Sequence, residues 1–199
     1  MGKQFIIAIS REFGSGGHHI AEELAKRFGV SYYDHNLLDE IAEQKGFNVH
    51  KLNKYDEAPR RKVLSRSVRG YSNSPEEVIA ELQFDYLREK AEAGESFVIV
   101  GRCAESILAD YKGLIPIFVS ADIEDKIARI MERRGISEAE AFAAMKRHDH
   151  HRKSYHNHFC ETRWGDSRAY DLCVNTSALG IEGTTDFLEH FIRMRIEKM

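Results

Sequence analysis

Short apolar runs recur along the chain and alternate with segments of helical periodicity. Five of these runs have the length of buried strands: 5–9, 30–33, 97–100, 115–119 and 171–174. They are apolar throughout instead of alternating with polar residues, which is typical of strands that are covered on both faces. The pattern therefore predicts an α/β fold, with a five-stranded parallel sheet and helices on both of its faces.

Two of the intervening segments have a clear helical pattern. In residues 18–28, every fourth position from Ile20 to Phe28 is apolar, and Gly29 is well placed to end the helix. Residues 121–135 repeat this pattern and also end at a glycine. Both segments are expected to pack one apolar face against the sheet.

Two further segments are longer or more polar than a simple crossover between strands requires. Residues 35–93 are polar and rich in arginine, and Ser74 followed by Pro75 predicts the start of a helix within them. The arginines of this segment are interpreted as solvated. Residues 137–160 begin with a helix-capping signal at Ser137 and then carry many cations.

Composition limits the classes of function. The chain has 199 residues, of which 42% are hydrophobic and 31% charged, as expected for one globular domain covering 1–199. Its net charge of −3 does not favour nucleic-acid binding. The N-terminal apolar run is too short for a signal peptide, and no later run could cross a membrane. The three cysteines have no metal-binding spacing, so we expect reduced thiols in a cytoplasmic protein.

The candidate chemistry begins in the stretch FIIAISREFGSGGHHIA, residues 5–21. Glycines between a buried strand and a helix let several backbone N–H groups converge on one point, where the positive end of the helix dipole favours an anion. The candidate phosphate-binding residues are Arg11, Gly14, Ser15, Gly16, Gly17, His18 and His19. An ordinary tight turn without a ligand is the alternative.

This stretch departs from the usual phosphate-binding signature, G-x-x-x-x-G-K-[ST]. Arg11 stands in the position of the first glycine, and Gly16 in that of the second. Gly17 takes the position of the lysine, and His18 that of the hydroxyl residue that contacts magnesium. The helix opens without a side-chain cap, so its free N–H groups need a partner, and Arg11 could supply the missing charge.

Three stretches together make the chain recognisable: ISREFGSGGHHIAEELAKRFGVSYYDHNLL, FVIVGRCAESIL and YDLCVNTSALGIEG. They resemble the cytidylate-kinase-like family, a branch of the P-loop nucleoside-monophosphate kinases, over essentially the whole chain. The resemblance implies a helical monophosphate-binding insertion at about 35–93 and a mobile lid helix at about 137–160. It also implies ATP and Mg²⁺ as donor and cofactor.

The resemblance assigns roles to individual residues. Arg102 matches an arginine that grips the acceptor nucleotide, and Asp34 matches an aspartate at the rim of the monophosphate site. Both follow predicted strands, at the sheet edge where ligands of α/β proteins bind. A surface ion pair for Arg102 and a helix N-cap for Asp34 are the alternatives.

The resemblance also implies that the lid helix carries catalytic cations. Asp149 and Arg152 keep the aspartate-x-x-arginine spacing of the family, and Arg147 and Lys153 add positive charge nearby. Such cations would stabilise the transferring phosphoryl group and exclude water. A solvated charged face is the alternative, and no metal site is predicted among the many histidines.

Two main functions remain open at this stage. The first is ATP-dependent phosphoryl transfer to a nucleoside monophosphate, with CMP or dCMP as the first choice. The second is a nucleotide-binding regulatory protein without kinase turnover, since the lysine is missing. A kinase with a non-nucleotide acceptor is a third, and a homodimer is left open.

Overall fold

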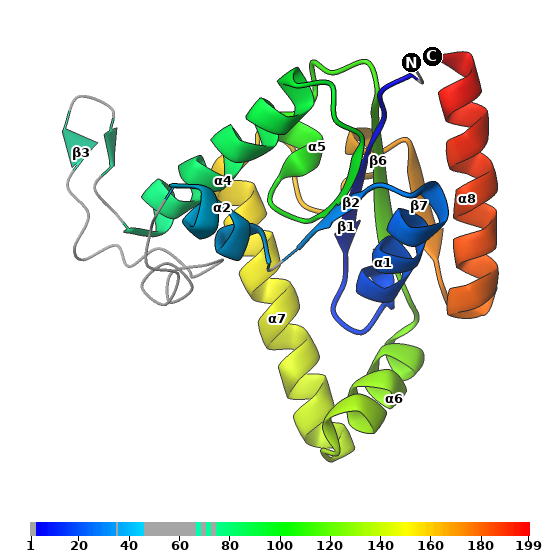
Figure 1. Ribbon diagram of the computed structural model, residues 1–199. Helices are drawn as coiled ribbons and strands as arrows, with labels where there is room; N and C mark the ends of the chain where they lie inside the picture. Colours follow the sequence, from blue (N-terminus) through cyan, green and yellow to red (C-terminus); the bar gives the residue numbers. More distant parts are fainter. Residues whose placement is uncertain (1–2, 35, 46–66, 69–70, 73–74) are drawn as a thin grey trace.

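The computed structural model describes the chain except residues 1–2, 35, 46–66, 69–70 and 73–74. Its main strands are β1 Ile6–Arg11, β2 Ser31–Tyr33, β5 Phe97–Val100, β6 Leu114–Ser120 and β7 Leu172–Asn175. They form one five-stranded sheet in the order β2-β5-β1-β6-β7, and every neighbouring pair is parallel. The predicted parallel sheet is therefore confirmed (Figure 1).

The longer helices are α1 Gly17–Phe28, α4 Pro75–Glu92, α6 Ile123–Arg134, α7 Glu138–Phe159 and α8 Gly180–Lys198. Two shorter helices are α2 Leu37–Lys45 and α5 Ala104–Ile107, and a 3₁₀ turn covers Ser167–Ala169. A small antiparallel pair joins β3 Ser67–Val68 to β4 Tyr71–Ser72. The sequence pattern did not predict α8.

The sheet separates two hydrophobic cores. On one face, α1 and α8 contribute Ile20, Leu24, Leu188 and Ile192, which are all fully buried. On the other face, α2, α4 and α5 pack against the opposite side chains of the same strands. Burying one such aliphatic side chain contributes about 1.5–3 kcal/mol, so these layers hold the strand ends in fixed positions. Helices on both faces were predicted and are confirmed (Figure 1).

Helix α7 extends away from the sheet and packs against α6, so that the two helices form an arm at the lower end of the molecule in Figure 1. The start of α7 is fixed by a capping box, because Ser137 and Glu140 each bond the backbone N–H of the other. A small core fills the angle between the helices, and Phe13 from the glycine-rich loop is part of it. The helix predicted over residues 137–160 is thus confirmed.

The structure describes part of the insertion predicted at about 35–93. It contains α2, α4 and the β3–β4 pair, and α4 begins at Pro75 as expected. The serine predicted to cap this helix and the arginine-rich stretch before β3 lie outside the described residues. Helices α2 and α4 pack together over the sheet edge at β2, which places them beside the predicted acceptor site (Figure 1).

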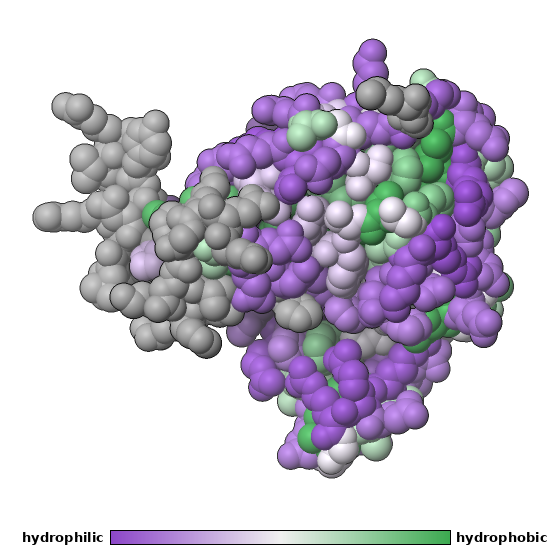
Figure 2. All heavy atoms as spheres, in the orientation of Figure 1, coloured by the Kyte–Doolittle hydropathy of each residue, from purple (hydrophilic) through white to green (hydrophobic). Residues whose placement is uncertain are grey.

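Most of the described surface in Figure 2 is hydrophilic, with smaller hydrophobic areas between. None of the helices within the described residues is sufficiently long and apolar to cross a membrane.

Candidate active site

The glycine-rich loop connects β1 to α1 and is held from outside by side chains of other elements. Gly14 and Gly16 have φ angles of 86° and 85°, a backbone conformation that other residues rarely adopt. Nη1 of Arg129 donates to the carbonyl oxygen of Gly14 at 3.2 Å, and Oγ1 of Thr176 donates to that of Ser15 at 2.9 Å. With its carbonyls held on the outside, the loop can turn its N–H groups inward.

The open end of α1 faces a cavity of about 670 Å³. Gly16 is the N-cap of this helix and makes no side-chain cap. The positive end of the helix dipole therefore faces the cavity, where it favours an anion, as the sequence suggested. Six arginines line the cavity: Arg11, Arg102, Arg129, Arg133, Arg134 and Arg152. The carboxylates that line it are Glu12 and Asp34.

Relative to the usual motif, the cation and the glycine have exchanged positions. Arg11 stands where the motif has its first glycine, and Gly17 stands where it has its lysine. A Cβ atom added to Gly17 would lie 2.7 Å from Cβ of Arg11, closer than real Cβ atoms approach one another. A lysine at position 17 would therefore require Arg11 or the backbone of the loop to shift. Arg11 was expected to be able to supply the missing charge, and it is 8% exposed and lines the cavity. The loop thus keeps a cation, supplied from the strand end instead of the helix start.

Asp34 lies at the end of β2 in a cluster of cations. Its Oδ2 is 2.7 Å from Nδ1 of His18, and its Oδ1 is 3.5 Å from Nη2 of Arg11. Burial acts to raise the pKa of Asp34, but the hydrogen bond with His18 and the charges of Arg11 and Arg102 outweigh it and hold this pKa well below its usual range. The carboxylate is ionised at neutral pH and orients the two residues from the loop.

Arg102 occupies the turn after β5, where it was predicted to bind the acceptor. It is 3% exposed, and it lines both the main cavity and a much smaller neighbouring one. Arg102 and Cys103 have φ angles of 59° and 54°. Left-handed backbone at two successive residues other than glycine costs free energy, and such strain is concentrated at functional sites. This backbone aims Arg102 into the cavity instead of along the sheet edge.

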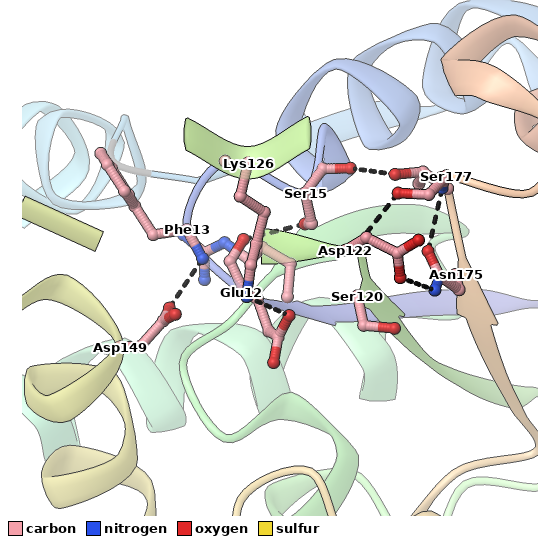
Figure 3. Close-up of polar contacts among 12 residues, drawn as sticks. Glu12, Phe13, Ser15, Ser120, Asp122, Lys126, Asp149, Asn175 and Ser177 are labelled. Atoms are coloured by element: carbon pink, nitrogen blue, oxygen red, sulfur yellow. Dashed lines mark hydrogen bonds and ion pairs between the residues drawn. The ribbon is translucent and has the colours of Figure 1, made fainter. Parts of the chain in front are cut away.

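Phe13 joins the loop to the arm. Its backbone N–H donates to Oδ1 of Asp149 at 2.7 Å (Figure 3). Its ring stacks on His148 with centroids 4.1 Å apart, and the guanidinium groups of Arg134 and Arg152 lie 4.8 Å and 5.7 Å from the ring centroid. Asp149 thus fastens α7 to the loop, while the aromatic ring holds cations at the cavity wall.

His148 is neutral at physiological pH. Burial, together with the nearby charges of Arg134, Arg152 and Arg147, lowers the pKa of His148 to about 4.

A second layer of polar contacts supports the loop on the side of α6. Nζ of Lys126 lies 2.8 Å from Oε2 of Glu12, and Lys126 is 6% exposed (Figure 3). The first turn of α6 is tied to β7 through Asp122, which accepts from the side chain of Asn175 at 2.8 Å. These contacts fix the base of the arm relative to the sheet.

The structure brings most of the predicted site residues together. Those that line the cavity are Arg11, Gly14, Gly16, Gly17, His18, His19, Asp34, Arg102 and Arg152. Ser15 is fully buried beneath the loop, where its hydroxyl donates to the carbonyl oxygen of Glu12.

The predicted grouping of the lid cations needs a correction. Arg147 is exposed and does not line the cavity, and Lys153 faces a separate surface hollow with His150 and His158. Because residues 147 and 153 leave α7 in directions other than that of Arg152, a catalytic role for them would require α7 to move.

Sequence reasoning missed the three arginines of α6: Arg129, Arg133 and Arg134. Their i, i+4, i+5 spacing places them on one helical face, a signal that is visible in the sequence. Which way this face points depends on how α6 packs against α7, and that packing could not be read from the pattern.

The residues of the cavity can be compared with the ligands that the predicted Mg²⁺ ion requires. Mg²⁺ prefers oxygen ligands and is usually held by one or two carboxylates together with substrate phosphates. Within the described part of the chain, the carboxylates that line this cavity are those of Glu12 and Asp34. Each of them is paired with a cation. The residues present do not form a ready magnesium site, so we expect the ion to arrive with ATP.

Comparisons with solved structures establish the class of fold. The chain is similar to shikimate kinase from Bacteroides thetaiotaomicron, with 14% identity, a TM-score of 0.54 and coverage of 95% of this chain and 98% of that one. Shikimate kinase from Acinetobacter baumannii in complex with shikimate gives 10% identity, a TM-score of 0.51 and coverage of 96% and 94%. The protein therefore has the fold of P-loop kinases.

The family follows from the sequence comparison. Residues 6–178 match the model of the cytidylate kinase-like family, and the chain belongs to this family. An uncharacterized protein from Eubacterium ventriosum shares 40% identity and a TM-score of 0.75, over 96% of this chain and 99% of that one. A comparison with curated proteins gave no match.

Proposed function

We propose that this protein is a kinase that transfers the terminal phosphoryl group of ATP to a nucleoside monophosphate, with CMP or dCMP as the first acceptor to test. The observation that carries the proposal is the meeting of six arginines with the open N-terminus of α1 in one cavity. Phosphoryl transfer requires little covalent chemistry from the protein. It requires two substrates held in line and neutralisation of the migrating charge.

Each wall of the cavity has its own task in this proposal. The N–H groups at the start of α1, together with Arg11, bind the donor phosphates. Arg102 clamps the acceptor phosphate, which its fork of N–H groups can do with two hydrogen bonds. Arg152 and the arginines of α6 stabilise the charge that develops during transfer. Mg²⁺ supplies further neutralisation when it is bound with ATP.

The excess of positive charge favours an acceptor that itself carries a phosphate. Six arginines oppose two carboxylates in the cavity, and both carboxylates are engaged in ion pairs. An acceptor that carries its own phosphate would neutralise more of this positive charge than an uncharged acceptor would. A non-nucleotide acceptor, as for the structurally similar shikimate kinases, is a second candidate because it can also carry an anionic group.

The missing lysine is the argument for a nucleotide-binding regulator without turnover. The placement of Arg11 weakens this argument, because a cation lines the cavity beside the helix start. Arg152 weakens it further, since a passive binding site has less use for charge aimed at the transferring group.

An ADP-release assay separates these functions. The purified protein is supplied with ATP and Mg²⁺, and then with CMP, dCMP, other nucleoside monophosphates, shikimate or no acceptor. We expect release of ADP with CMP or dCMP well above the rate without an acceptor. Binding of ATP without ADP release for any acceptor would favour the regulator, and release with shikimate alone would favour the non-nucleotide kinase.

A further inference from the structure

Three buried polar side chains form a hydrogen-bonded network that the proposed reaction does not use. Oγ of Ser10 donates to Oε2 of Glu105 at 3.2 Å, and Nε2 of His156 lies 2.6 Å from Oε1 of the same carboxylate. Ser10, Glu105 and His156 are 4%, 7% and 4% exposed. They belong to β1, α5 and α7, so one carboxylate joins three elements that are far apart in the sequence.

Each member of the network is within four residues of an arginine of the cavity. The pairs are Ser10 with Arg11, Glu105 with Arg102, and His156 with Arg152. These three arginines, hereafter the shared arginines, line both the main cavity and a small one of about 20 Å³. Ser10 and His156 also line the small cavity, so the network and the shared arginines meet at its walls.

The pair of Glu105 and His156 is a buried ion pair. Burial acts to lower the pKa of His156, but the neighbouring Cys160 and the bonded carboxylate of Glu105 outweigh it and raise this pKa to about 10. The imidazole is therefore charged at neutral pH. Removing two charges from water costs free energy of about the size that their attraction returns, so an apolar pair of similar volume is often as stable. What the hydrogen-bonded pair adds is a fixed distance and direction between the elements that carry it.

We propose that Glu105 is a positioning residue, which holds the shared arginines at the spacing that a phosphate group bound in the cavity requires. Its Oε2 fixes the end of β1 next to Arg11, and its Oε1 fixes α7 one helical turn beyond Arg152. Glu105 itself follows the left-handed turn that carries Arg102. The inference rests on the proposed function only as far as the cavity binds phosphate, and it requires neither turnover nor a particular acceptor.

A comparison of stability with binding in the full-length protein tests this role. An apolar double variant, Glu105→Met with His156→Leu, replaces the ion pair by side chains of similar size, so the free energy of unfolding in urea should be unchanged or higher. Calorimetric affinity for CMP, or for inorganic phosphate where CMP does not bind, should nevertheless fall about 10-fold, as for residues that act in one network. Where turnover is measurable, kcat should fall about 100-fold, because a displacement of about 1 Å at a substrate-positioning group can cost this much.

A second pair of the same kind on α7 provides the matched control. Nε2 of His158 lies 3.1 Å from Oε1 of Glu77, and neither of these residues adjoins a shared arginine in the sequence. Glu105→Gln should weaken binding of the same probe about 10-fold. Glu77→Gln, which is the identical chemical change, should leave that affinity unchanged.

Wild-type affinity of the apolar double variant for CMP or phosphate would overturn the proposal, and so would a loss of affinity that only accompanies a loss of stability. Should this variant fail to fold, Ser10→Ala decides, because it removes one hydrogen bond from the same carboxylate, and unchanged affinity would then overturn the proposal. Wild-type protein that binds the probe but releases no ADP would refute the proposed kinase and leave the role of Glu105 intact. Wild-type protein that binds neither CMP nor phosphate would refute both.

Discussion

The two walls of the cavity present cations in different ways. On the sheet wall, Arg11, Asp34 and Arg102 are 8%, 5% and 3% exposed, and they stand at strand ends fixed by two hydrophobic cores. On the arm wall, Arg133 and Arg134 are exposed in the last turn of α6. In the proposed reaction, we therefore expect the sheet wall to bind substrates in a preset geometry and the exposed arginines of the arm wall to adjust to them.

The arm is attached to the loop by few groups. Phe13 contacts Asp149 of α7, Glu12 and Gly14 contact Lys126 and Arg129 of α6, and the core between the two helices is small. Elements with few buried contacts move at low cost in free energy, as closing lids do. Substitutions on the two walls should therefore affect different steps of the proposed reaction.

The largest effect is expected from Arg152→Ala on the arm wall. We expect turnover to be abolished, with a loss of about 100-fold or more, because a donor that stabilises the transition state is removed. ATP should still bind to the loop with a modest loss, measured by calorimetry. Lys153→Ala is the control, since the neighbouring side chain lies outside the cavity. Near-normal turnover of Arg152→Ala, with turnover lost in Arg11→Ala, would place the essential cation on the sheet wall.

Arg102→Ala tests the sheet wall. Truncation of a buried charge-assisted contact costs about 2–5 kcal/mol, so kcat/KM for the acceptor should fall by that free energy. Calorimetric affinity for ATP should change little, since Arg102 is proposed to bind the acceptor. An unchanged kcat/KM for every active acceptor would exclude the assigned role.

The exchange between positions 11 and 17 is tested by a double-mutant cycle. Gly17→Ala should lower the free energy of unfolding by about 1–3 kcal/mol, because its Cβ would overlap that of Arg11. Combined with Arg11→Gly, the same change should cost less than the sum of the single effects, by about 1 kcal/mol. Gly183→Ala in α8 is the control, with its nearest contact at 3.3 Å. Strict additivity in urea unfolding would show that the two residues do not compete for space.

His148 on the arm predicts a smaller, pH-dependent effect. Its pKa is about 4 in the folded protein and about 6.5 in an unfolded chain, so the unfolded state binds more protons between these values. Stability should therefore fall as pH decreases from 6.5 towards 4. His148→Phe keeps an aromatic ring on Phe13 and removes the proton site, so it should lose less stability between pH 7.5 and 5. If the wild-type protein and His148→Phe lose the same free energy of unfolding, measured in urea, between these pH values, the lowered pKa of His148 is contradicted.

The same comparison explains what the sequence could predict. Residues of the sheet wall follow apolar runs directly, and the carboxyl ends of parallel strands share one edge, so Arg11, Asp34 and Arg102 could be grouped from their positions. The arginines of α6 and the pairing of His156 with Glu105 depend on how helices cross. A helical pattern gives a face but not its partner, so these contacts required the structure.

The central claim is that the cavity holds two nucleotides with their phosphates facing each other, and a crystal structure with ADP and CMP tests it most directly. The account predicts the β-phosphate of ADP at the N–H groups of Gly16, Gly17 and His18, with Arg11 beside it. It predicts the phosphate of CMP against Arg102, across the cavity from ADP. ADP phosphates that make no contact with the loop, or a CMP phosphate bound away from Arg102, would contradict the account.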